Sequence, residues 1–234
     1  MNTKELDKKY VLQTYGRGDI EFVSGDNATL TDSEGKQYID FTSGIGVVSV
    51  GHANARVNAT ICQQIGKITH TSNLYNIAPQ AKAAEAIVNA SGYDMACFFG
   101  NSGAEANEGA IKIVRKHGER DGEIKRYKII TLKHSFHGRT ITTVKATGQE
   151  AMHNYFGPFP DGFVYADNIQ AIEALLDDHT AAVMIELIQG EGGVEPQDKK
   201  QVQALEKLLK SKHIPLIVDE VQTGGYRTGE FTAS

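Results

Sequence analysis

The sequence predicts an α/β protein built on a mostly parallel sheet with helices on both faces. Four short apolar runs, MACFF, YKIITL, AAVMIEL and IPLIV, are separated by amphipathic helical patterns. Runs of this length indicate strands buried on both faces, and helical connections between them favour parallel pairing. Before them, residues 20–41 alternate partly and carry turn signals at Ser24-Gly25 and Glu34-Gly35, which predict a small β-hairpin or meander.

The composition is that of a soluble globular chain with an acidic balance. The 234 residues are 40% hydrophobic and 23% charged, and 24 Lys and Arg against 29 Asp and Glu give a net charge of −5. This charge disfavours nucleic acid as a partner, because phosphate backbones require a basic surface. No apolar run reaches the length of a membrane span, and the start MNTKELDKKY lacks a signal-peptide core. Only two cysteines occur, Cys62 and Cys97, and they form no CxxC or CxxxC set. We therefore expect a reduced, cytoplasmic location.

The helical patterns follow in order along the chain. Helices are predicted over residues 53–68 and 79–90, the second with Pro79 in its first turn, where proline is well tolerated. The stretches EANEGAIKIVRKHG, NIQAIEALLDD and KKQVQALEKLLKSK are predicted to be the helices that alternate with the apolar strands. The sequence shows no repeat and no linker.

Ligands of open α/β sheets bind beyond the carboxyl ends of the strands, so the residues after each apolar run are the candidates. After MACFF, Gly100 and Gly103 allow a tight turn, and Ser102 is placed to cap a helix beginning near Ala104. The free amides of such a helix start can bind an anion. A simple capped connection would read the same way, and neither a Walker A motif nor a G-x-G-x-x-G fingerprint is present.

The loop after YKIITL, KHSFHGRT, combines an aromatic ring with cationic side chains. His134 and His137 are a possible pair of metal ligands, but no third ligand is nearby in the sequence, so we expect no metal. A second interpretation is a polar loop with one packed phenylalanine. A third is that Phe136 stacks on a planar ligand while Arg139 binds a carboxylate through its planar fork.

Carboxylates follow the last two apolar runs. Glu186 lies inside one run, Glu191 follows in a glycine turn, and Asp219 comes directly after IPLIV. A buried carboxylate needs a cation or several donors, so Asp219 pairs with an arginine, caps a helix or holds the protonated ring nitrogen of a ligand. Together these loops offer an anion cradle, a stacking ring, a ring-nitrogen carboxylate and a carboxylate-binding arginine. That set suits a phosphorylated pyridinium cofactor and an amino-acid substrate.

Six motifs in order resemble the class III aminotransferases, which depend on pyridoxal 5'-phosphate, and most of all the bacterial acetylornithine aminotransferases. They are DFTSGIGVVSVGH, HTSNLY, FFGNSGAEANEGAIK, HSFHGRT, IQGEGGV and DEVQTGGYRTG, and the resemblance extends from about Tyr10 to the end of the chain. It implies the type I fold of pyridoxal-phosphate transferases and a homodimer with active sites at the interface. It also implies that residues 1–52 are a β segment of the small domain, and residues 53–234 an incomplete large domain.

The resemblance assigns cofactor-binding roles by motif. It implies phosphate binding by Gly103 and Ala104, stacking by Phe136 and pairing of the ring nitrogen with Asp219. The remaining positions implied to bind the cofactor are Glu220, Val221 against the opposite ring face, and Gln222 at the ring hydroxyl.

Three further residues are implied to contact substrate. Arg139 would hold the α-carboxylate and Glu191 would act as a gate, while Ile45 stands where ornithine aminotransferases carry a tyrosine, which favours acetylornithine. Two positions depart from the family: Gly225-Tyr226 replaces an x-Gly pair, and Ala104 replaces a threonine common among relatives.

The function implied by the resemblance is transfer of an amino group from N-acetylornithine to 2-oxoglutarate, a step of arginine biosynthesis. The family's Schiff-base lysine lies beyond the Asp219 motif, and this chain has no lysine after Lys212. We therefore expect a truncated chain, without its catalytic lysine and inactive by itself. The alternatives are another class III enzyme, acting on ornithine, 4-aminobutyrate, diaminobutyrate or succinyl-diaminopimelate, a noncatalytic ligand-binding protein, and, most distant, a metal hydrolase using His134 and His137.

Overall fold

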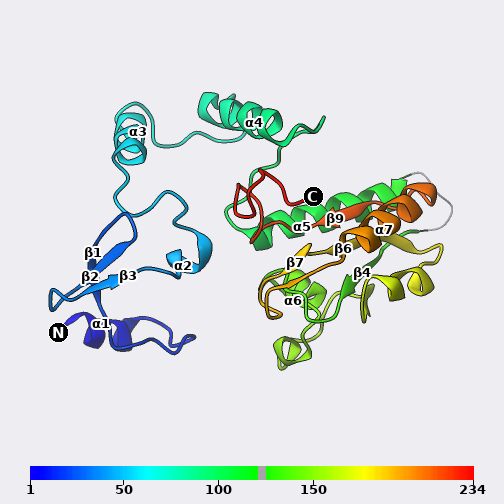
Figure 1. Ribbon diagram of the computed structural model, residues 1–234, viewed down its shortest axis with the longest axis horizontal. Helices are drawn as coiled ribbons and strands as arrows, with labels where there is room; N and C mark the ends of the chain where they lie inside the picture. Colours follow the sequence, from blue (N-terminus) through cyan, green and yellow to red (C-terminus); the bar gives the residue numbers. More distant parts are fainter. Residues whose placement is uncertain (121–124) are drawn as a thin grey trace. The chain divides into compact units, whose positions relative to one another are not determined.

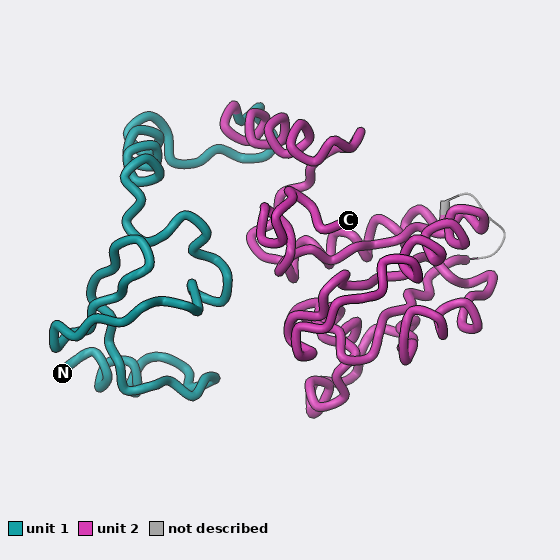
Figure 2. The backbone as a smooth tube through the Cα atoms, in the orientation of Figure 1, with its two compact units in different colours: residues 1–77 teal, residues 78–234 magenta. Residues whose placement is uncertain are grey.

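The computed structural model describes residues 1–120 and 125–234 and divides into two compact units. Unit 1 comprises residues 1–77 and unit 2 comprises residues 78–234 (Figure 2). The expected division at residues 52 and 53 concerns the domains of a longer protein and stays a prediction. In the described part of the chain, no helix is both long and apolar enough to cross a membrane.

Unit 1 is built around a three-stranded antiparallel meander of order β1-β2-β3 (Figure 1). Its elements are α1 (Thr3–Tyr10), β1 (Phe22–Asp26), β2 (Thr29–Asp32), β3 (Gln37–Ile39), α2 (Ser43–Gly46) and α3 (Ala55–Ile65). The predicted meander and the predicted helix over residues 53–68 are therefore confirmed.

One of the two predicted turns in this meander is wrong. Gly35, with φ of +83°, forms the β2–β3 turn as predicted, whereas Gly25 lies inside β1. A Cβ at Gly25 would come within 2.8 Å of Cγ of His52, so this glycine permits close packing rather than a turn. The β1–β2 turn instead begins at Asn27, which has φ of +48°.

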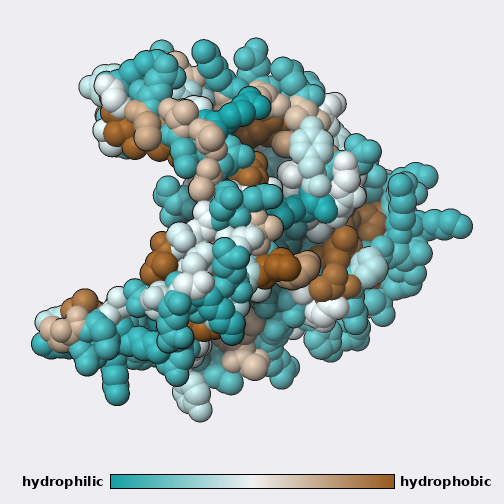
Figure 3. Space-filling view, turned by 60° about the vertical axis from the view of Figure 1, so that its left-hand side comes forward, coloured by the Kyte–Doolittle hydropathy of each residue, from teal (hydrophilic) through white to brown (hydrophobic). Residues whose placement is uncertain are grey.

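Unit 1 has no apolar core of its own. The buried hydrophobic side chains of the described chain lie between Ile111 and Ile214, all in unit 2. In unit 1, Phe41 is 93% exposed and Leu74 is 87% exposed. The space-filling view shows hydrophobic residues reaching the surface in several patches between hydrophilic ones (Figure 3). Unit 1 is ordered instead by polar contacts such as those of Asp32, whose carboxylate accepts from the backbone amides of Glu34 and Lys36.

Unit 2 contains a four-stranded parallel sheet of order β5-β4-β6-β9. Its helices are α4 (Ala78–Ser91), α5 (Gly103–Arg120), α6 (Ile141–Ala146), α7 (Lys199–Ser211) and the 3₁₀ turns η1 (Glu150–His153) and η2 (Gln170–Leu175). The parallel strands are β4 (Lys128–Leu132), β5 (Phe163–Ala166), β6 (Thr180–Ile185) and β9 (Leu216–Val218), and a small antiparallel pair is β7 (Ile188–Gln189) with β8 (Glu195–Pro196).

Both faces of this sheet are covered, as predicted. Alternate residues of a strand point to opposite faces, so Ile129 and Ile130 of β4 belong to two different apolar clusters. One cluster joins the sheet to η2 and α7, and the other joins it to α5 and α6. Every residue of β6 is buried, which places this strand at the centre of the core.

Two predicted elements of unit 2 are wrong. The run MACFF, residues 95–99, is not a strand, and Phe98 is 70% exposed. A strand requires a neighbour for its backbone hydrogen bonds, and none of the four parallel strands pairs with this run. The stretch NIQAIEALLDD forms the 3₁₀ turn η2 rather than an α-helix. A three-residue repeat already buries both Ile169 and Ile172, which suits a 3₁₀ turn.

Several elements of unit 2 were not predicted, among them β5, α6, η1 and the pair β7 and β8. Strand β5 is a short edge strand behind the sequence FGPFPDG, whose turn residues mask it. Helix α6 is only six residues long and begins with a capping box in which Thr140 accepts from the amide of Thr143. The predicted helices α4, α5 and α7 and the predicted strands β4, β6 and β9 are confirmed.

Candidate active site

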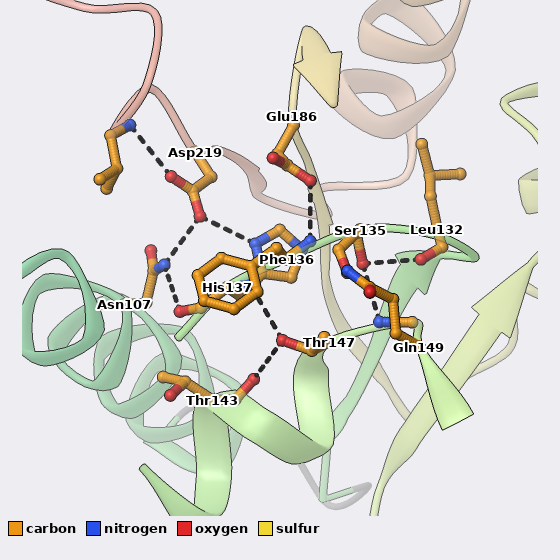
Figure 4. A network of polar contacts seen from close by, with 12 residues as sticks. Asn107, Leu132, Ser135, Phe136, His137, Thr143, Thr147, Gln149, Glu186 and Asp219 are labelled. Atoms are coloured by element: carbon orange, nitrogen blue, oxygen red, sulfur yellow. Dashed lines mark hydrogen bonds and ion pairs between the residues drawn. The ribbon is translucent and has the colours of Figure 1, made fainter. Parts of the chain in front are cut away.

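The candidate site lies at the carboxyl edge of the parallel sheet, where three strand ends meet. Asp219 follows β9, the loop of residues 133–140 follows β4, and Glu186 follows β6. Parallel strands present their carboxyl ends at one edge, which brings these loops together. Figure 4 shows Asp219, Phe136, His137, Glu186 and Asn107 of α5 in one network of polar contacts.

Asp219 is buried and fully engaged on one of its two carboxylate oxygens. Its Oδ2 accepts from Nδ1 of His137 at 2.8 Å and from Nδ2 of Asn107 at 2.8 Å (Figure 4). Its Oδ1 accepts from the amide of Val221 at 3.1 Å. Burial raises the pKa of Asp219, but the hydrogen bond and charge of His137, together with the donors Val221 and Asn107, hold that pKa below its usual value. The carboxylate is therefore ionised at neutral pH.

Glu186 fixes the backbone of the stacking candidate. Its Oε2 accepts from the amide of Phe136 at 2.9 Å. Burial raises the pKa of Glu186, and the bond from Phe136 only partly opposes this effect. The glutamate in the apolar run AAVMIEL therefore has a structural role, because its carboxyl group anchors the loop that follows the neighbouring strand β4.

The start of α5 packs against both of the other segments. A Cβ at Gly103 would lie 2.7 Å from Cγ2 of Val221, and a Cβ at Gly138 would lie 2.8 Å from Cβ of Ala104. Only glycine at these two positions allows such close approach. The predicted cap is confirmed, because Oγ of Ser102 accepts from the amide of Glu105 at 3.2 Å.

The amides of Gly103 and Ala104 open α5 and are available to an anion. Neither amide is hydrogen-bonded within the described residues. They lie at the positive end of an 18-residue helix, which favours a phosphate group there. Two amides at a helix start that have no acceptor within the described residues, and an ionised carboxylate with acceptor capacity left on Oδ1, together fit a phosphorylated pyridinium ring.

The remaining predicted residues of unit 2 lie in the loops that follow β4, β7 and β9. The guanidinium carbon of Arg139 lies 5.5 Å from the ring centroid of Phe136, in a cation–π arrangement. Gln222 is exposed beside the turn that holds Glu191, since a Cβ at Gly190 would lie 3.4 Å from its Cγ. The carboxylate of Glu220 is turned elsewhere and accepts from the amides of residues 233 and 234.

Ile45 belongs to unit 1 and occupies a strained backbone. Ser43, Gly44, Ile45 and Gly46 have φ values of +50°, +64°, +61° and +77°, so the single turn of α2 is left-handed. This conformation is unfavourable for a β-branched residue. The side chain of Ile45 is 74% exposed.

Two other predictions concerned a metal at His134 and His137 and the loop in which Gly225-Tyr226 differs from the family pattern. His137 bonds Asp219 rather than a metal set, and the described residues contain no group of three or more His, Cys, Asp or Glu that could hold a metal ion. Tyr226 has φ of +68°, and its ring contacts that of Phe231 edge-on at 5.4 Å. The ring of Tyr226, which differs from the family pattern, thus packs within the last loop.

Sequence reasoning missed Asn107 and understood His137 only as a metal candidate. The signal for Asn107 was its helical position: residues 107, 111 and 114 share one face of α5, and Ile111 and Val114 are core residues. An amide on an apolar stripe requires a buried partner. For His137 the sequence offered no signal for its partner, which is 82 residues away.

Known proteins share both the sequence and the fold. Residues 14–234 match the family model described as Aminotransferase class-III. An acetylornithine aminotransferase of Wolinella succinogenes is 64% identical over 230 residues, covering 98% of this chain and 58% of that protein. One from Methanocaldococcus jannaschii is 46% identical over 239 residues, covering 99% and 58%. The chain therefore spans a little over half the length of these curated relatives.

Solved structures agree with this fold. An ornithine aminotransferase of Toxoplasma gondii, with partial occupancy of PLP at its active site, superposes with a TM-score of 0.90 at 36% identity, covering 98% of this chain and 55% of that one. The N-acetylornithine aminotransferase of Stenotrophomonas maltophilia K279a gives a TM-score of 0.79 at 34% identity, covering 98% and 56%.

Proposed function

This chain belongs to the class III aminotransferases, a family that depends on pyridoxal phosphate, and on that premise we propose that the full-length protein transfers the amino group of N-acetylornithine to 2-oxoglutarate. The reaction belongs to arginine biosynthesis, and we propose a cytoplasmic homodimer as its setting. The observation that carries the proposal is Asp219, a buried ionised carboxylate with acceptor capacity left on Oδ1.

Each residue of the site has a defined task in this proposal. When bound, pyridoxal phosphate supplies a ring that accepts the electrons released at the amino acid's α carbon. The amides of Gly103 and Ala104 bind its phosphate, and Asp219 keeps its ring nitrogen protonated. Phe136 and Val221 enclose the ring faces.

Four other residues complete the proposed site. Gln222 bonds the ring hydroxyl, and Glu220 supports the loop after β9 that carries Gln222. Arg139 holds the α-carboxylate of the substrate. Glu191 acts as a gate: it pairs with an arginine of the full-length protein and releases it when a dicarboxylate enters. A lysine of the full-length protein transfers the proton between substrate and cofactor.

Substrate choice is supported by Ile45 and by the names of the relatives. An exposed apolar side chain offers no acceptor to a free ammonium, whereas it can contact an acylated amine. The test is the kcat/KM of the full-length protein with N-acetylornithine and with ornithine, each with 2-oxoglutarate. We expect a preference for N-acetylornithine. Equal efficiencies would overturn the substrate assignment and favour a broader class III enzyme.

Asp219→Asn tests the cofactor site in the same protein. The change removes the charge at nearly constant shape, so we expect an intact fold and a rate lower by about 10³-fold. Folding is checked by circular dichroism, and Glu195→Gln, an exposed change, is the control. A folded Asp219→Asn protein with near-normal turnover would assign this carboxylate a structural role instead.

A further inference from the structure

The two oxygens of Asp219 have unequal surroundings. Oδ2 receives two side-chain donors at 2.8 Å each, from His137 and Asn107, whereas among the described residues Oδ1 receives only the amide of Val221, at 3.1 Å. A carboxylate oxygen accepts about two hydrogen bonds. Oδ2 is therefore saturated by the protein, and Oδ1 keeps room for one further donor.

The two donors to Oδ2 are themselves fixed. Asn107 also donates from Nδ2 to the carbonyl oxygen of His137 at 2.8 Å, which ties α5 to the loop. The amide of His137 donates to Oγ1 of Thr147 at 2.9 Å, and that hydroxyl donates to the carbonyl oxygen of Thr143 at 3.0 Å (Figure 4). The backbone on both sides of the His137 ring is thus held by α5 and by α6.

The ring of His137 has a single polar partner. Its side chain is fully buried, and Nε2 has no hydrogen-bond partner among the described residues. A buried polar atom without a partner is costly, so packing alone would favour an apolar side chain at this position. The bond from Nδ1 to Asp219 is what distinguishes histidine there.

We propose that His137 and Asn107 are positioning residues that occupy Oδ2 of Asp219 and thereby direct Oδ1 to the ring nitrogen of a pyridinium ligand. The identity of the ligand rests on the proposed function, but the orientation and ionisation of Asp219 are properties of the chain itself. The two parts can therefore be tested separately.

The first test measures the ionisation of Asp219 in the 234-residue chain without ligand, by following the carbon-13 shift of its carboxyl against pH. We expect His137→Leu to raise the pKa of Asp219, and His137→Asn, which restores a donor, to lower it again. Asn107→Ala, which removes the other donor, should also raise it. His52→Leu is the matched control, because His52 is a partly buried histidine whose Nε2 bonds a different aspartate, Asp40 of unit 1, at 2.8 Å.

Circular dichroism accompanies each variant, and Asn107→Ala serves if His137→Leu does not fold. An Asp219 pKa that stays the same in His137→Leu and Asn107→Ala would overturn the positioning role. So would an equal rise in the His52→Leu control.

The second test compares the binding of pyridoxal phosphate with that of its 1-deaza analogue, in which carbon replaces the ring nitrogen. We expect the unchanged chain to prefer pyridoxal phosphate, and His137→Leu to reduce this preference at least about tenfold while leaving the affinity for the analogue unchanged. Binding without any preference would overturn the direction of Oδ1 toward a ring nitrogen. Binding of neither compound would contradict the proposed cofactor site, while the titration would still decide the role of His137.

Discussion

Arg139 lies exposed beside the ring of Phe136. Its planar guanidinium can bind a carboxylate through two parallel hydrogen bonds, which lysine cannot reproduce. We expect Arg139→Lys in the full-length protein to lower kcat/KM for the amino-acid substrate by about 2 kcal/mol, or roughly 30-fold. The measurement is steady-state kinetics with Arg56→Lys, an exposed arginine of unit 1, as the control. Unchanged kinetics in Arg139→Lys would remove this residue from substrate binding.

Glu186 gives a pH-dependent prediction at the same scale. Burial raises its pKa in the folded chain above the value in the unfolded chain, so the folded state binds this proton more readily. The contribution of Glu186 to stability is therefore greatest below the unfolded pKa and falls as the pH rises through the raised value. Glu186→Gln keeps an oxygen that can accept from the amide of Phe136 and removes the buried charge.

We therefore expect Glu186→Gln to unfold at higher urea concentration than the unchanged chain at pH 7. The difference should shrink at acidic pH, where Glu186 is protonated. Urea midpoints at both pH values provide the measurement, and Glu195→Gln, an exposed glutamate, should stay within about 0.5 kcal/mol of the unchanged chain. A lower midpoint for Glu186→Gln at pH 7 would show that the charge itself stabilises the loop.

At the scale of elements, β6 is the strand on which unit 2 depends. It lies between β4 and β9, and Met184 is buried completely in the cluster shared with α5. Met184→Ala leaves a cavity in this cluster, so we expect a loss of about 2–5 kcal/mol in the free energy of unfolding. Leu74→Ala, a change at an 87% exposed side chain of unit 1, is the control and should shift stability by less than about 0.5 kcal/mol. A small effect of Met184→Ala would mean that this cluster contracts around the cavity.

At the scale of the whole molecule, the two units differ in what holds them together. The buried hydrophobic residues of the described chain lie in unit 2, and unit 1 relies on its meander and on polar contacts such as the 2.8 Å pair of His52 and Asp40. Few buried contacts imply low local stability. We expect amide hydrogen exchange in β1, β2 and β3 to be much faster than in β4 and β6, measured by mass spectrometry on the 234-residue chain. Equal protection of the two sheets would show that unit 1 is stabilised by contacts outside its own residues.

The sequence by itself determined the elements whose signals are local. Buried apolar runs predicted β4, β6 and β9, and amphipathic patterns predicted α5 and α7. Helices were also predicted at α3 and at α4, the latter with Pro79 in its first turn, and the helix cap at Ser102 was predicted from one residue type at one position. The six motifs were sufficient for the family and for the type I fold. These signals predict structure without tertiary information, because propensity, periodicity and capping depend on residues within about one turn of each other.

Only the tertiary structure decided which apolar runs became strands and which polar groups met. The run MACFF has strand propensity but pairs with no strand of the described residues, while the weaker run of β5 pairs with β4. Asp219 was expected to need a partner, yet its donors lie 82 and 112 residues away in His137 and Asn107. Pairing between strands and between buried charges is a property of distant segments brought together, because backbone and carboxylate groups must find donors within about 3 Å wherever the chain supplies them.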